Sequence, residues 1–163
     1  MSTVETAIGT LEFIRPRTLG LLEKIEKEPD PLAVLAWRPG PGRAHIGWQL
    51  MHIGVTEEIF ATERLAPAKP RSWAALWPRF RGGSTPDDKV PTPAEIRAVL
   101  AGTRQQLLAT VREWGDARLG EVPEALKERG WTFRDVLSLV AFHEAHHQGQ
   151  AHLTFNLYRA AHP

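Results

Sequence analysis

Hydrophobic residues recur at helical spacing in four long segments of the chain. The segments span residues 3–28, 43–65, 92–114 and 131–158, and each carries apolar residues three or four positions apart. Such spacing places the apolar side chains on one face of an α-helix, and that face must be buried against another element. No segment alternates polar and apolar residues as a half-buried strand does. The pattern predicts an all-α fold, a four-helix bundle.

Proline, glycine and capping residues set the expected ends of these helices. Pro16 lies inside the first segment, so we expect a kink there or a division into two shorter helices. Thr92 followed by Glu95 predicts a capping box at the start of the third helix, and Gly115 is its natural end. Thr132 is the expected cap of the last helix.

The connection over residues 66–91 is long and rich in proline, glycine and aromatic residues. Its aromatic residues predict that part of it packs against the bundle, with a helical turn near residues 72–77, and a second turn is expected at 123–128. The connection is long enough to cross the bundle, which argues against a simple up-down-up-down order. We interpret Arg71, Arg79 and Arg81 as a solvated basic loop, with contact to an anionic ligand as the alternative.

Length and composition restrict the classes of protein. A chain of 163 residues predicts a single domain over 1–163, and a formal charge of +1 without a basic run predicts neither nucleic acid nor a membrane as partner. The sequence shows no signal-peptide pattern, so we expect a cytoplasmic protein. It contains no cysteine, which excludes disulfides, zinc fingers and a thiol nucleophile supplied by the protein.

The last helical segment carries four of the seven histidines. His143 and His147 are four residues apart and share one face of the helix, where two imidazoles can bind one metal ion. The alternative is that both are structural histidines with separate hydrogen-bond partners. His146 and His152 point to other faces, and we interpret them as structural or surface residues.

Two familiar metal motifs overlap this histidine pair. His143-Glu144-Ala145-His146-His147 matches the H-E-x-x-H signature of zinc proteases, but no acidic residue follows Glu144, and Gln150 and Leu153 occupy the positions of the glycine and histidine that one large protease group requires. Glu144-x-x-His147 is also half of a di-iron motif, and the chain has no second copy. Neither motif is complete.

His52 offers a third imidazole from the core face of the second helical segment. Three protein ligands that leave a position open are typical of catalytic metal sites. His45, Trp48, Glu144 and Gln150 are our candidates for residues that line the cavity or support the ligands. A role for Glu144 as a base requires that its edge of the helix faces the cavity, because it is rotated about 100° from His143.

Three segments of the chain carry a family resemblance. They are Trp37-Arg38-Pro39-Gly40-Pro41-Gly42, Ile46-Gly47-Trp48-Gln49-Leu50-Met51-His52-Ile53 and His143-Glu144-Ala145-His146-His147-Gln148-Gly149-Gln150. In these segments the chain resembles the DinB/YfiT-like superfamily of small four-helix bacterial proteins. Family members often have arginine where Gln148 stands, so any contact made by that arginine is in doubt.

The resemblance has several implications for fold and function. It implies an up-down-down-up bundle, often a homodimer, in which His52, His143 and His147 bind one divalent ion, expected to be zinc, nickel or iron. It also implies a thiol S-transferase that uses a low-molecular-weight thiol such as bacillithiol or mycothiol on a small-molecule electrophile. A metal-dependent hydrolase and a non-catalytic, metal-stabilised stress-response binding module are the alternatives.

Overall fold

The structure, a computed structural model, describes residues 2–163, and every regular element in this range is a helix, which confirms the all-α prediction. The α-helices are α1 (Thr3–Glu26), α2 (Pro31–Ala36), α3 (Ile46–Ile59), α4 (Trp77–Phe80), α5 (Pro93–Trp114) and α6 (Phe133–Ala161). A π-helix, η1 (Phe60–Arg64), continues α3, and short 3₁₀ segments form η2 (Ala74–Leu76), η3 (Asp116–Arg118) and η4 (Glu124–Arg129). Between residues 2 and 163, no helix combines the length and the apolar character that crossing a bilayer requires.

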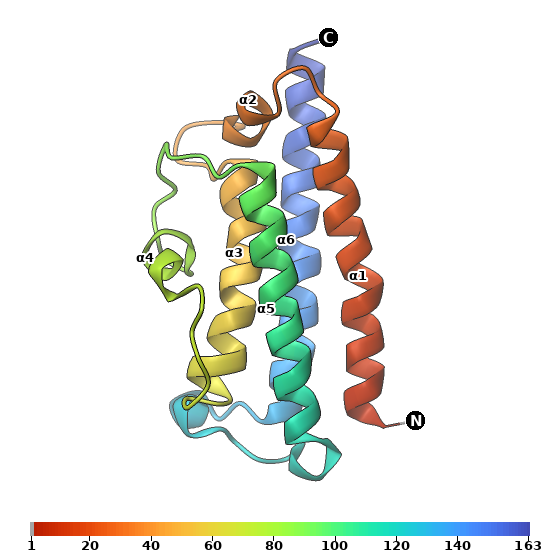
Figure 1. Cartoon of the computed structure of the whole chain (residues 1–163), viewed down its shortest axis with the longest axis vertical. Coiled ribbons are helices and arrows are strands. Elements are labelled where there is room, and N and C mark those ends of the chain that lie inside the picture. The colour runs from red at the N-terminus through yellow and green to blue at the C-terminus, as the bar shows by residue number, and fades with distance from the viewer. Residues whose placement is uncertain (1) are drawn as a thin grey trace.

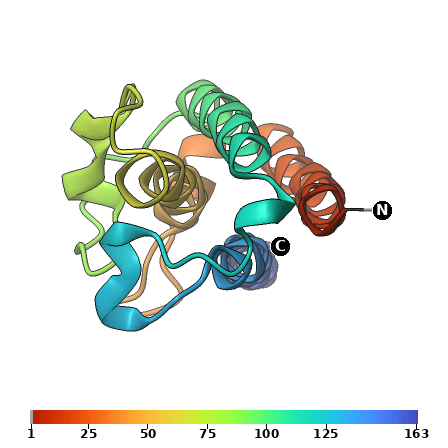
Figure 2. The same cartoon turned by 90° about the horizontal axis from the view of Figure 1, so that it is seen from below.

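The four long helices lie side by side around a common core. α1 and α6 run in one direction, and α3 and α5 run in the opposite direction (Figure 1). Seen from the end of the molecule, α3 packs against both α5 and α6, and α1 packs against α6 and α5 (Figure 2). The chain segment with α4 lies outside α3, on the side away from α1.

Local signals place most helix ends where the sequence predicts them. The Thr92 and Thr132 side chains both take part in capping boxes, and Gly115 ends α5 with a φ of 64°. α1 continues through Pro16 as one helix, so the expected alternative of two shorter helices does not occur. The expected start of α3 near residue 43 is wrong, because His45 occupies the cap position and the helix begins at Ile46.

Helix α3 is the most enclosed element of the fold. Every one of its residues except Thr56 is buried, because the 66–91 connection covers the face that the bundle leaves open. The fully buried Glu58 carboxylate accepts hydrogen bonds from the Trp73 backbone N–H at 2.9 Å and from Trp77 Nε1 at 2.8 Å. The expected packing of the connection against the bundle is therefore present, with η2 and α4 at the predicted turn.

Gly54 allows α3 and α5 to approach each other closely. A Cβ atom added at Gly54 would lie 2.7 Å from Cγ1 of Val99, a distance that side chains do not tolerate without movement. A side chain at this position would push α3 away from α5, and His52 lies on the same helix two residues earlier.

We predict that Gly54→Ala lowers the free energy of unfolding. Overpacking costs about 1–3 kcal/mol, whereas the better helix propensity of alanine returns at most about 1 kcal/mol. Gly9→Ala is the matched control, because Gly9 lies in α1 with nothing within 4 Å of the added Cβ, and alanine there should stabilise the helix. Urea unfolding measures both variants. If Gly54→Ala and Gly9→Ala stabilised the protein equally, the close approach of α3 and α5 at Gly54 would be contradicted.

Candidate metal centre

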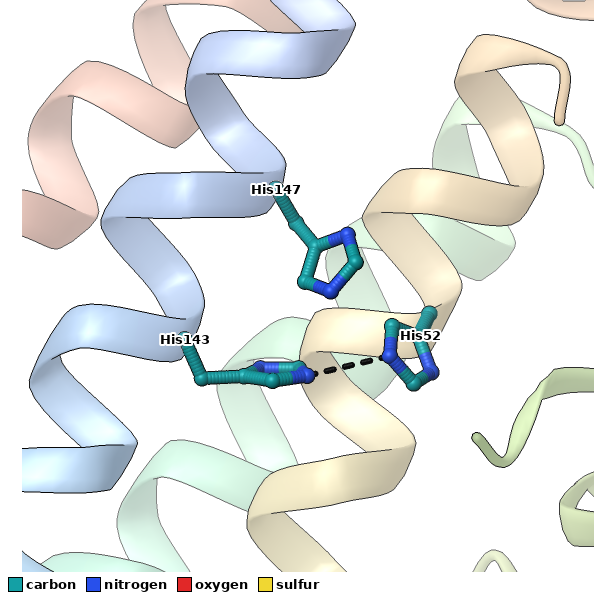
Figure 3. Close-up of side chains that lie close together, drawn as sticks. All are labelled: His52, His143 and His147. Carbon is teal, nitrogen blue, oxygen red and sulfur yellow. Dashed lines mark hydrogen bonds between the residues drawn. The ribbon is translucent and has the colours of Figure 1, made fainter. Parts of the chain in front are cut away.

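Three histidines from two helices converge at one point in the bundle. His52 projects from the middle of α3, and His143 and His147 project from successive turns of α6 (Figure 3). One ring nitrogen from each histidine lies within 4.8 Å of the other two, and Nε2 of His143 is 3.0 Å from Nε2 of His52. Among residues 2–163, no other group of three histidine or acidic side chains is close enough to hold one ion. The structure brings together the three histidines that the sequence predicts as ligands.

Two of the three rings are oriented through their Nδ1 atoms. The Nδ1–H group of His52 donates to the Phe80 carbonyl at 2.6 Å, and that of His147 donates to Oε1 of Gln49 at 2.5 Å. Trp48 stacks on the His52 ring with a centroid distance of 4.6 Å. A histidine whose Nδ1–H is bonded in this way presents the lone pair of Nε2, as metal-binding histidines do. His52 and His147 are thus oriented as metal-binding histidines are.

Burial keeps the three imidazoles neutral. Burial and the neighbouring His52 and His147 rings lower the pKa of His143 to about 3, and burial followed by His52 lowers the pKa of His147 to about 4. Burial also lowers the pKa of His52, although its hydrogen bond to the Phe80 carbonyl acts in the opposite direction. Only neutral imidazole binds a metal ion, so the low pKa values suit the group for that role.

The chemistry of the group fits a divalent ion. Three neutral imidazoles without a thiolate or carboxylate suit zinc, nickel or iron, and they leave coordination positions for a ligand from outside the protein. A pocket of about 430 Å³ lies beside the three histidines, with Trp131 and Phe60 among its walls. A small molecule can therefore reach the ring nitrogens.

Glu144 belongs to a different part of the bundle. Its side chain is 1% exposed, and its carboxylate accepts hydrogen bonds from Nε of Arg15 and from the Thr18 hydroxyl, both at 2.8 Å, and from Arg104. Both carboxylate oxygens are bonded within the bundle, and Glu144 does not line the pocket beside the three histidines. Glu144 therefore does not serve as the base of an H-E-x-x-H protease, nor does it support the histidines directly.

The group around Glu144 is a buried ion cluster that joins all four long helices. It contains Arg15 of α1, Glu57 of α3, Arg104 of α5 and Glu144 of α6, and Glu57 binds Arg15 at 2.7 Å and Arg104 at 2.5 Å. The Nη1 groups of the two arginines donate to backbone carbonyls, that of Arg15 to Leu100 and that of Arg104 to Leu11. In the described chain, no fully buried side-chain nitrogen or oxygen lacks a hydrogen-bond partner. Two positive and two negative charges leave the cluster neutral.

The other predicted neighbours of the site divide into two groups. Trp48 contacts His52 as described, whereas His45 caps α3 through its Nδ1 atom, which accepts from the Trp48 N–H at 3.0 Å, and it does not line the pocket. Gln150 is exposed and bonds to His146 at 2.8 Å, and its side chain also acts on His147, whose pKa it raises slightly against the effect of burial. The sequence analysis missed Gln49, although this residue lies one turn before His52 and shares its side of the helix.

Comparison with family models shows to which superfamily the chain is related. The family model described as the DinB superfamily matches residues 10–151, which confirms the resemblance drawn from the three sequence segments. No curated protein and no solved structure gives a significant match to the chain.

We predict that Glu144→Gln lowers the free energy of unfolding by about 3 kcal/mol or more, because removing one member of a buried ion pair leaves its partners uncompensated. Zinc stoichiometry should stay unchanged. Glu113→Gln is the matched control, since Glu113 forms a surface pair with Lys69 and its loss should cost less than about 1 kcal/mol. Urea unfolding and elemental analysis measure the two properties. Loss of zinc in a folded Glu144→Gln variant would show that the carboxylate supports the metal centre.

Zinc affinity should change little as the pH falls from 7.5 through about 6.5, the pKa of a free imidazole, because burial lowers the pKa of all three histidines, to about 4 for His147 and about 3 for His143. Calorimetric titration across this range measures the effect. Histidines of the unfolded chain bind protons below about pH 6.5 while the buried ones do not, so the metal-free protein loses stability as the pH falls through this range. Circular dichroism must show that it is folded at each pH. An affinity that declines from pH 6.5 onward would mean that the rings titrate as exposed imidazoles.

Proposed function

The chain belongs to the DinB superfamily, and from this membership and the histidine geometry we propose that it is a divalent-metal-dependent enzyme with His52, His143 and His147 as ligands. The observation that carries the proposal is the orientation of the rings. The Phe80 carbonyl and Gln49 hold the Nδ1–H groups of His52 and His147, and this leaves the Nε2 atoms to face a shared space beside an accessible pocket.

The more specific proposal is a thiol S-transferase that acts on small electrophiles with a bacillithiol- or mycothiol-type thiol. A divalent ion at the site would favour the thiolate, which is the nucleophile, over the thiol. In the transfer, the thiol sulfur forms a bond to the electrophilic atom, the leaving group departs with its bonding electron pair, and the thiol proton passes to solvent. The chain has no cysteine, so the sulfur must come from an external thiol.

The residues of the chain have separate tasks in this proposal. Gln49 and the Phe80 carbonyl orient the imidazoles, and the Trp48 ring covers one face of His52. The pocket of about 430 Å³ has room for a small electrophile rather than a macromolecule.

The proposal also includes the finer features that the family implies. The opposite directions of α1 and α6 against α3 and α5 support an up-down-down-up bundle. The homodimer, the single domain over residues 1–163 and the cytoplasmic location stay predictions from the sequence.

We predict that the purified protein binds one divalent ion per chain and that His52→Ala reduces its affinity at least about tenfold, since one of three ligands is lost. Inductively coupled plasma mass spectrometry measures the occupancy. His146→Ala is the matched control, because His146 is exposed, bonds to Gln150 and only packs edge-on against the His147 ring, at a centroid distance of 5.1 Å, without joining the three-histidine group. Full occupancy in His52→Ala would overturn the three-histidine site.

The reaction is tested by incubating the metal-loaded protein with each thiol and a chlorodinitrobenzene. A conjugate that forms with the wild type and with His146→Ala but not with His52→Ala supports the transferase. Thiol-independent cleavage of ester substrates would favour the hydrolase instead, in which bound water attacks the substrate. If the metal-loaded protein forms neither the conjugate nor the cleavage product, the result would favour the non-catalytic binding module.

A further inference from the structure

Three arginines line the pocket beside the metal centre. Arg64, Arg81 and Arg129 all contribute to its walls, and none of the residues that line it is acidic. A cavity whose charged side chains are all guanidinium groups and imidazoles is suited to a negatively charged occupant.

The arginines reach this pocket from three separate segments. Arg64 ends η1, Arg81 follows α4, and Arg129 ends η4. Arg81 is adjacent to Gly82, whose position lies against the His52 ring, since a Cβ added there would be 3.9 Å from Cε1 of His52. The residue that directly precedes Arg81, Phe80, is also the one whose carbonyl orients His52. The guanidinium groups and the histidines therefore share one space.

The π-helix explains why Arg64 can face this space. Arg64 is twelve residues after His52 and would lie about 120° away from it around a continuous α-helix. In η1 the Leu65 N–H bonds to the Phe60 carbonyl at 3.0 Å, five residues back, so the chain turns less per residue there. The wider turn brings Arg64 back toward the side of His52. Such turns inside helices are frequent at functional sites.

Little in the chain neutralises these three charges. Arg81 and Arg129 are exposed and form no salt bridge with any residue in the range 2–163, and Arg129 lies 4.9 Å from the Trp131 ring centroid. Arg64 pairs only with its neighbour Glu63, at 3.2 Å. Arg79, from the same connection as Arg81, is by contrast held by Asp87 through two bonds of 2.8 and 2.9 Å. Contact with an anionic ligand, the alternative to a solvated basic loop, therefore fits Arg81 and not Arg79.

We infer that the substrate of this site is a small anion, whose carboxylate or phosphate-type group binds Arg81, Arg129 and Arg64 while its reactive end lies at the three histidines. The inference rests on the proposed function for the reaction, but it concerns a separate set of contacts. A carboxylate has two oxygens and a tetrahedral phosphate-type group has up to three, and in both a pair of oxygens can accept two parallel N–H bonds from one guanidinium group.

The test is a titration of metal-free, ¹⁵N-labelled protein with phenylphosphonate, phenylacetate and benzyl alcohol, observed through the arginine Nε–Hε signals. Removing the metal separates binding to arginine from coordination of the anion by an ion. We expect saturable shifts of the Arg81 and Arg129 signals with at least one of the two anions, and none with benzyl alcohol. The tighter anion identifies the group as carboxylate or phosphate-type.

The double variant Arg81→Gln/Arg129→Gln should weaken anion binding by about tenfold or more, because two charge-assisted hydrogen bonds are lost. Arg43→Gln is the matched control, since Arg43 is exposed and lies outside the pocket, and it should change the affinity less than about twofold. All three side chains are on the surface, so the variants should fold, and the spectra show directly whether they do. Equal weakening by Arg43→Gln, equal binding of benzyl alcohol, or no saturable binding of either anion would overturn the inference.

The metal centre and the anion site can fail separately. Loss of the ion in His52→Ala, with phenylphosphonate binding kept, supports both proposals. Full metal occupancy in His52→Ala removes the proposed function but leaves the arginine contacts supported by the titration of metal-free protein. Absence of anion binding in a protein that still holds one ion per chain removes only the anionic substrate.

Discussion

Four buried charges at the centre of the bundle constrain how its long helices meet. Arg15, Glu57, Arg104 and Glu144 come from four different helices, and each arginine is bonded to both glutamates. A buried charge without its partner costs several kcal/mol. Each helix therefore has one rotation about its axis that places its charged side chain next to the oppositely charged partners. On α6 this rotation directs Glu144 into the cluster and turns His143, about 100° away, toward α3.

The same constraint positions the partner helix. Glu57 fixes the face that α3 turns toward the cluster, and Gly54 lets α3 lie close against α5. His52 is five residues before Glu57, which places it on a different side of α3 and opposite the α6 histidines (Figure 3). The three histidines and the ion cluster are thus adjacent groups of one bundle, and both draw residues from α3 and α6.

The long 66–91 connection completes the site from outside the bundle. Glu58 binds two of its tryptophans, the Phe80 carbonyl orients His52, and Arg81 reaches the pocket. A connection of this length is longer than is needed only to join α3 to α5. Its contacts show that it covers the apolar outer face of α3 and contributes to the walls around the three histidines.

Much of the fold follows from signals within single helices, because periodicity, capping boxes and Gly115 act over one or two turns. The grouping of the three histidines was also predictable, since the spacing of His143 and His147 and the core position of His52 are local features. The tertiary structure assigned Glu144 to the ion cluster, Gln49 to Nδ1 of His147, and the arginines to the pocket. The partner of a buried polar group is whatever the neighbouring helix presents to it, and that depends on packing between segments far apart in the chain.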